Sequence, residues 1–246
     1  MRTALLISGN PRFTANFDLQ LENLQNSEID WYVVLWRRGE LQDNRTSRNW
    51  TEVQTESDAL QLIGSHLPFG HRIQHLELLN PYDYLTMPRM YETSYFPTIF
   101  IWHQYMSLKI CDQRRINSGI NYDLVIRSRP DLGLDRSIDL QFIRDALQTR
   151  RNWIVTPDNQ RHGKDPMLCD QFAIGLPETM SKYCSSVDMF DQLYLEGIDY
   201  NPECLLQAAL WKQGIEYPPC NFNIVRPEEY WVVAPHGRWG QLQVKK

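Results

Sequence analysis

The sequence predicts a single α/β domain built on a mainly parallel sheet that is flanked by helices. Short apolar runs, typical of strands buried on both faces, recur along the chain and alternate with stretches of helical spacing. No linker, internal repeat or low-complexity segment divides the 246 residues. With 42% hydrophobic residues, the chain has enough apolar surface for one large core.

The first half alternates strands with helices. We expect strands at 3–8, 30–36 and 72–79, and helices at 13–24 and 57–67. A turn at 9–12 follows the first strand, Ser57 is a possible cap of the second helix, and the polar stretch 37–55 is predicted to be an exposed loop. This order is that of a parallel sheet with right-handed crossovers.

The second half begins with a long helix at 97–116 that leads into a strand at 122–132. We then expect a helix at 138–147, a strand at 153–156, a polar loop at 159–166, a strand at 169–176, and helices at 177–195 and 202–213. Gly214 would end the last helix as a C-cap.

Charge and composition exclude several classes of partner. The net charge of −5 argues against broad attraction to nucleic acid, and no apolar stretch is long enough for a transmembrane segment or a signal peptide. The five cysteines are odd in number and lack a Cys-x-x-Cys pair, so free thiols in a reducing compartment are expected. We therefore expect a cytoplasmic protein, in the host cytoplasm if the source is viral.

The strand at 122–132 carries the most informative residues. Its apolar run Leu-Val-Ile is followed by Arg127, Arg129 and Asp131, which share one face if the chain is extended. Pro130 ends regular pairing and delivers Asp131 to the carboxyl edge, where open α/β sheets bind ligands. Arginines that grip phosphate, beside an acid that can hold a divalent metal, indicate a nucleotide-diphosphate site. An Arg–Asp pair that seals the end of the sheet explains the same residues equally well.

The first turn supplies a second part of this site. Ser8 ends the first strand and Gly9 begins the turn. Glycine lets a ligand approach the backbone, and Arg12 could meet a base or a phosphate. The turn lacks the Gly-Lys-Ser/Thr of a P-loop and the glycines of a dinucleotide fingerprint. An ordinary strand–helix turn remains the alternative.

Two acids are candidates for the acceptor side. Asp170 opens a strand beside Gln171, where the pair could orient a sugar hydroxyl or accept its proton. Glu203 lies in the first turn of a helix, where interaction with the helix dipole is an equally good explanation. Because Asp170 follows a polar loop, we expect it at an open rim of the site, where an acceptor hydroxyl enters. The alternative for Asp170 is a cap of that loop.

The C-terminal segment adds a histidine and an arginine in a loop with two glycines. His236 could serve as a metal ligand or a diphosphate donor, and Arg238 as a phosphate or substrate contact. A frayed tail is the alternative for both residues.

The order of three motifs resembles a known group of proteins. Ser-Gly-x-Pro-Arg at 8–12, the run at 122–132 and Asp-Gln-Phe-Ala-Ile-Gly at 170–175 are similar to glycosyltransferase-like proteins of polysaccharide and surface-glycan genes and of large DNA viruses. The resemblance covers most of the chain. It implies a GT-A type, Rossmann-like fold, a nucleotide-sugar donor, a glycan acceptor and often a divalent cation such as Mn²⁺.

The resemblance also implies roles for individual residues. Arg129-Pro130-Asp131 stands where GT-A enzymes carry Asp-x-Asp, so only Asp131 keeps the acidic character of the metal site. His236 resembles the C-terminal histidine that completes the cation site in some of these families. Gln104 lies where such folds often contact the donor.

We therefore expect a hexosyl- or pentosyltransferase of polysaccharide biosynthesis, with the carboxylate of Asp170 or Glu203 as the catalytic base. Residues 1–135 would form the nucleotide-binding half, and 136–246 the acceptor-side half and C-terminal tail. A non-catalytic nucleotide- or glycan-binding protein with a degenerate GT-A fold is the alternative, favoured by the missing second aspartate. A phosphotransferase or nucleotidyltransferase is the third hypothesis. Such an enzyme would need two acids to hold two metal ions.

Overall fold

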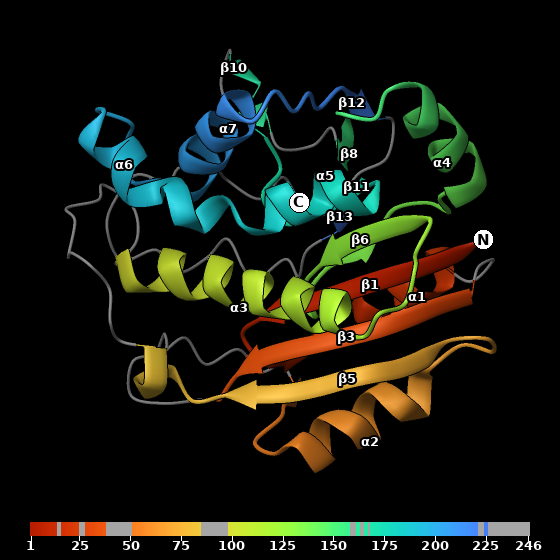
Figure 1. Cartoon of the computed structure of the whole chain (residues 1–246). Coiled ribbons are helices and arrows are strands. Elements are labelled where there is room, and N and C mark those ends of the chain that lie inside the picture. Colours follow the sequence, from red (N-terminus) through yellow and green to blue (C-terminus); the bar gives the residue numbers. More distant parts are fainter. Residues whose placement is uncertain are drawn as a thin grey trace, which may run out of the picture.

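The molecule consists of a mixed sheet between two layers of helices (Figure 1). The structure is a computed structural model that describes residues 1–13, 16–24, 28–37, 51–84, 98–157, 161–162, 165–166, 168–220 and 224–225.

The main sheet has the strand order β12-β8-β11-β6-β1-β3-β5. These strands are β1 (Arg2–Gly9), β3 (Glu28–Trp36), β5 (Arg72–Leu79), β6 (Leu124–Ser128), β8 (Ile154–Pro157), β11 (Ala173–Gly175) and β12 (Pro219–Cys220). The neighbours β5, β3, β1 and β6 are parallel, whereas β11 runs antiparallel to both β6 and β8. The predicted α/β class and its mixed, mainly parallel sheet flanked by helices are confirmed.

The strand order reverses between β1 and β6. From β1 the chain builds outward to β3 and then β5, and it returns through a helix to add β6 on the other side of β1. Such a reversal separates the crossover connections of the two sides, and ligands of open α/β sheets bind at the carboxyl ends of the strands at this point.

The apolar runs of the central strands face both ways. Leu6 and Val125 contribute to the core on one face, and Leu5 and Ile126 contribute to the core on the other. Because successive side chains of a strand point to opposite faces, continuous apolar sequence is what two helical layers require.

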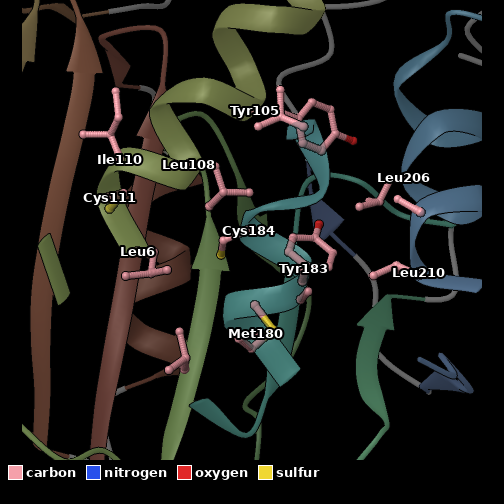
Figure 2. Packing of buried hydrophobic residues seen from close by; sticks show 14 of the residues in the cluster. Leu6, Tyr105, Leu108, Ile110, Cys111, Met180, Tyr183, Cys184, Leu206 and Leu210 are labelled. Carbon is pink, nitrogen blue, oxygen red and sulfur yellow. The ribbon is translucent and has the colours of Figure 1, made fainter. Parts of the chain in front are cut away.

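Helices cover the two faces in separate groups. One face is covered by α3 (Thr98–Asn117), α5 (Pro177–Cys184), α6 (Phe190–Leu195) and α7 (Pro202–Lys212). The other is covered by α1 (Asn16–Asn23), α2 (Glu56–His66) and α4 (Leu140–Thr149). Leu6, Leu108 and Tyr183, from β1, α3 and α5, lie together in the first of these cores (Figure 2).

Two helix predictions need correction. The helix predicted at 177–195 divides into α5, a 3₁₀ turn (Ser186–Met189) and α6. The hydroxyls of Ser185 and Ser186 both donate to the carbonyl of Lys182, a local bond that competes with regular helix continuation. The cap of α2 is Thr55 rather than Ser57, because Thr55 and Asp58 form a capping box.

Two strand predictions were too long. β6 ends at Ser128 rather than at residue 132, and Gln20 donates to the carbonyl of Leu132 beyond Pro130. β11 begins at Ala173 rather than at residue 169, and the carbonyl of Asp170 accepts the hydroxyl of Tyr183. In both segments, side chains take up the backbone groups that a longer strand would pair.

Short ribbons occupy parts of the predicted loops. These are β2 (Arg12–Phe13) with β4 (Thr51–Glu52), β7 (Gly133–Leu134) with β13 (Ile224–Val225), and β9 (Arg161–His162) with β10 (Asp165–Pro166). The rest of the predicted loop, at 38–50, lies outside the described residues. Gly214 follows α7 with a φ of +67°, as expected of a C-cap glycine.

Cysteines and helix hydropathy add two further findings. Cys111, Cys169, Cys184 and Cys204 are free thiols, and the side chain of Cys220 is not described. Among the described helices, none combines the length and the apolar character needed to cross a bilayer.

Candidate functional site

The candidate site lies at the carboxyl ends of β1 and β6, where the strand order reverses. Ile7 is in register with Ser128, the last residue of β6, so Gly9, the last residue of β1, lies near the turn that begins at Arg129. Gly9 has a φ of +117°, which favours glycine, and a Cβ atom at this position would meet no atom of the described residues within 4 Å. Gly9 is buried, and no described atom occupies the place where its side chain would begin.

Arg127 is the most unusual residue of this edge. It is in register with Leu6 of β1 and Ala173 of β11, which belong to the core beneath α3 and α5. Its exposed fraction is 0%, and its Nε, Nη1 and Nη2 atoms have no hydrogen-bond partner among the described residues. A buried charge without partners costs several kcal/mol, so this guanidinium is a strong candidate for contact with a ligand.

The charge of Arg127 also acts on two buried tyrosines. Burial raises the pKa of Tyr105 and of Tyr183 well above the ordinary value; the charge of Asp170 adds to this increase, and that of Arg127 opposes it. The hydroxyl of Tyr105 donates to the carbonyl of Pro202 (3.0 Å), and that of Tyr183 to the carbonyl of Asp170 (3.3 Å). Both tyrosine hydroxyl groups thus donate their protons to backbone carbonyls. The charges of Arg127 and Asp170 both affect the pKa of these two tyrosines.

Asp170 is buried rather than placed at an open rim. Its exposed fraction is 2%, its Oδ2 accepts a hydrogen bond from Nε2 of Gln104 (2.5 Å), and its Oδ1 has no partner among the described residues. Gln104 is half-buried on α3 and is more exposed than Asp170. The predicted partner of Asp170, Gln171, is also buried.

Glu203 reaches the same region from α7. Asn201 caps this helix by accepting from the backbone N–H groups of Glu203 and Cys204 (3.0 and 3.2 Å). Glu203 is half-buried, and its charge contributes to the raised pKa of Tyr105. It is therefore near Tyr105 and more accessible than Asp170.

Ser8 belongs to the same face of the sheet. It lies two residues beyond Leu6, the β1 residue in register with Arg127, so the two side chains point towards the same helical layer. Its Oγ is buried and has no partner among the described residues.

Arg129 and Asp131 form a pair of their own. Nε and Nη2 of Arg129 donate to the two carboxylate oxygens of Asp131 (2.8 and 2.6 Å), and their side chains are 13% and 5% exposed. Arg129, Pro130 and Asp131 lie beyond the end of β6, in a turn rather than in an extended strand. This is the arrangement of the alternative reading, in which an Arg–Asp pair seals the end of the sheet.

The described residues do not assemble a ligand set for a divalent cation. Both oxygens of Asp131 already accept from Arg129, and the described part of the chain contains no group of three or more His, Cys, Asp or Glu that could hold a metal. His236, Arg238 and the side chain of Arg12 lie outside the described residues.

One important residue was missed by the sequence reasoning. Gln20 is fully buried on α1, and its Nε2 donates to Ser128 Oγ (2.7 Å) and to the carbonyls of Leu132 (3.1 Å) and Arg129 (3.4 Å). It holds the turn that carries the Arg129–Asp131 pair. Its helical spacing from the apolar Phe17 and Leu24 was the available signal, because it places an amide on the buried face.

Comparisons with known proteins identify no relative of this chain. No protein-family model matches the chain, and no curated protein matches it.

Proposed function

We propose that the protein is a glycosyltransferase that moves a sugar from a nucleoside-diphosphate donor to a glycan hydroxyl. The observation that carries this proposal is Arg127, a buried guanidinium without a hydrogen-bond partner among the described residues. Asp170, whose charge acts with that of Arg127 on Tyr105 and Tyr183, has one unpartnered oxygen. These two groups lie near the strand reversal, where α/β sheets bind nucleotides.

The proposal assigns the nucleotide to the carboxyl edge of β1 and β6. Gly9 offers a backbone that a diphosphate can approach closely. The N-terminal part of α3 lies at this edge, since Nε1 of Trp36, the last residue of β3, donates to the carbonyl of His103. This helix end supplies positive potential where the leaving diphosphate would gain charge.

The acids near Arg127 would complete the reaction. In an inverting transfer a carboxylate takes the proton of the acceptor hydroxyl as that hydroxyl attacks the donor sugar. Asp170 and Glu203 are the two candidates, because the negative charges of both contribute to the raised pKa of Tyr105. The GT-A identity of the fold and the manganese ion remain predictions, and no step of this mechanism depends on the metal.

A second function is favoured by the Arg129–Asp131 pair. Both oxygens of Asp131, the one acid at the Asp-x-Asp position, already accept hydrogen bonds from Arg129. Asp131 therefore has a structural role. A protein that binds a nucleotide sugar or a glycan without transferring it would need no more than this.

Thermal shift with a panel of nucleotide sugars, each with and without Mn²⁺, tests whether a donor binds. A ligand at 100 times its Kd should stabilise the folded state by about 2.7 kcal/mol. Slow hydrolysis of the bound donor would support a transferase, and binding without hydrolysis would support the second function. If no member of the panel shifts the melting temperature, the transferase proposal loses its support, and of the second function only binding of a glycan is left.

A further inference from the structure

Among the buried charged residues that the structure describes, Arg127 and Asp170 have charged atoms without a hydrogen-bond partner. Arg127 offers donors on all three of its nitrogens, and Asp170 offers the acceptor Oδ1. A group that satisfies both must accept from a guanidinium and donate to a carboxylate. A hydroxyl does both, whereas a fully ionised phosphate only accepts.

The charge around the two residues argues against phosphate. Arg127 attracts an anion, but Asp170 acts on the same two tyrosines and repels it, and Glu203 adds a second negative charge near Tyr105. The attraction by Arg127 and the repulsion by Asp170 and Glu203 therefore oppose each other. Neutral hydroxyl groups have no such penalty and gain charge-assisted hydrogen bonds from both sides.

Depth in the structure indicates which hydroxyls these are. Arg127 and Asp170 are 0% and 2% exposed, and Gln104, which donates to Asp170, is half-buried. In a transferase the sugar that is being moved gains most from exclusion of water, because water competes with the acceptor for it.

We propose that Arg127 and Asp170 bind hydroxyl groups of the transferred sugar, and that the donor diphosphate lies outside this pair. This assignment rests on the proposed function, and it replaces the predicted role of Arg127 as a diphosphate ligand. The half-buried amide of Gln104 must move aside, or exchange its bond to Asp170, for the sugar to enter.

Calorimetry with nucleotides and their sugar conjugates tests the assignment on the full chain. The probes are UDP with UDP-glucose and UDP-galactose, GDP with GDP-mannose, and dTDP with dTDP-rhamnose, all in the presence of Mn²⁺. In Arg127→Met, affinity for the nucleotide sugar should fall about 10- to 100-fold, as expected when hydrogen bonds to a charged group are lost. Affinity for the free nucleoside diphosphate should remain within about twofold, because that ligand would not touch Arg127.

Asp170→Asn examines the pair from its other side. Nucleotide-sugar affinity should fall about tenfold, because a charge-assisted bond becomes a neutral one. If phosphate occupied the site, the same variant would bind the free diphosphate more tightly, since a repulsive charge is removed. That gain, or an equal loss of both ligands in Arg127→Met, would overturn the assignment. Unchanged binding of every ligand in Arg127→Met would also overturn it, and would indicate a site filled by water alone.

Arg114→Met is the matched control. Arg114 lies near the other end of α3, where it donates to both oxygens of Glu77, and its loss should leave every affinity unchanged. Glucose, galactose, mannose and rhamnose, followed by ligand-observed NMR, separate the two proposals. If wild type binds no nucleotide but binds a free sugar, and Arg127→Met loses that sugar, the hydroxyl site stands while the transferase proposal falls. If wild type binds neither nucleotide nor sugar, both proposals fall.

Discussion

Buried charge is treated in opposite ways at the two ends of the sheet. At the amino end, Asp30 accepts from Arg2 (2.7 Å), Gln74 (2.8 Å) and Tyr122 (3.1 Å). Burial raises the pKa of Asp30, but these hydrogen bonds lower it by more, so the pKa lies below its ordinary value. At the carboxyl side, Arg127 is equally buried and has no hydrogen-bond partner among the described residues.

This difference in hydrogen bonding distinguishes charged residues that stabilise the fold from charged residues that could bind a ligand. Asp30 has exchanged its water for three donors, so its charge is compatible with burial. Arg127 has lost water without that exchange, and a protein tolerates such a cost mainly where function requires it. The Arg129–Asp131 pair, although it lies at the carboxyl end, is satisfied in the same way as Asp30.

The largest effect is expected from Glu203→Gln. If Asp170 holds the transferred sugar, Glu203 is the acid left to take the acceptor proton, and turnover should fall by roughly 10²–10⁴-fold with donor affinity unchanged. Glu216→Gln, at the amino end of β8, should retain full turnover. Steady-state kinetics measures both variants, and normal turnover in Glu203→Gln would return the base role to Asp170.

Asp30→Ala should show that the amino end is structural. Removing a buried carboxylate with three donors should lower the free energy of unfolding by about 3 kcal/mol. Urea denaturation followed by circular dichroism measures this change. Asp145→Ala on α4, where the carboxylate is exposed, is the control and should leave the free energy of unfolding unchanged. Equal stability of the two variants would remove the distinction between the two ends.

His103 should make the carboxyl end sensitive to acid. It stacks on Trp36 (ring centroids 4.4 Å apart), and burial lowers its pKa from 6.5 to about 4. Because the unfolded chain takes up this proton near pH 6.5 and the folded chain only near pH 4, stability is complete above pH 6.5 and is lost as the pH falls towards 4. The loss should reach about 3 kcal/mol, and His103→Phe should abolish that part of it. Urea titrations at several pH values compare the two proteins, and identical pH profiles would contradict this prediction.

The smallest effect concerns Arg127→Met without ligand. Replacing a buried, unsatisfied charge by an apolar side chain of similar length should leave the free energy of unfolding unchanged or raise it by about 1–3 kcal/mol. This is opposite in sign to Asp30→Ala. A loss above about 1 kcal/mol in urea denaturation would mean that Arg127 has a structural partner, and would end the contrast between the two ends.

Much of the fold could be predicted because strong local patterns agree with it. The apolar runs at 3–8, 30–36 and 124–126 became the central strands, since helices on both faces require apolar residues at every position. The element ends were less predictable. β6 and β11 are shorter than predicted because distant side chains, Gln20 and Tyr183, take carbonyls next to them. No local pattern records such partners.

The sequence by itself determined the class of the fold and the chemistry available at the carboxyl edge. Periodicity specifies strands and helices, and the order of the elements limits the sheet to a few topologies. Only the tertiary structure decided which charges pair. Arg127, Arg129 and Asp131 are nearly adjacent, yet Arg129 binds Asp131 while Arg127 points into a core built by α3 and α5. Asp170 also became a buried neighbour rather than a residue of the rim. Pairing depends on segments that are far apart in the sequence and meet only when the helices pack on the sheet.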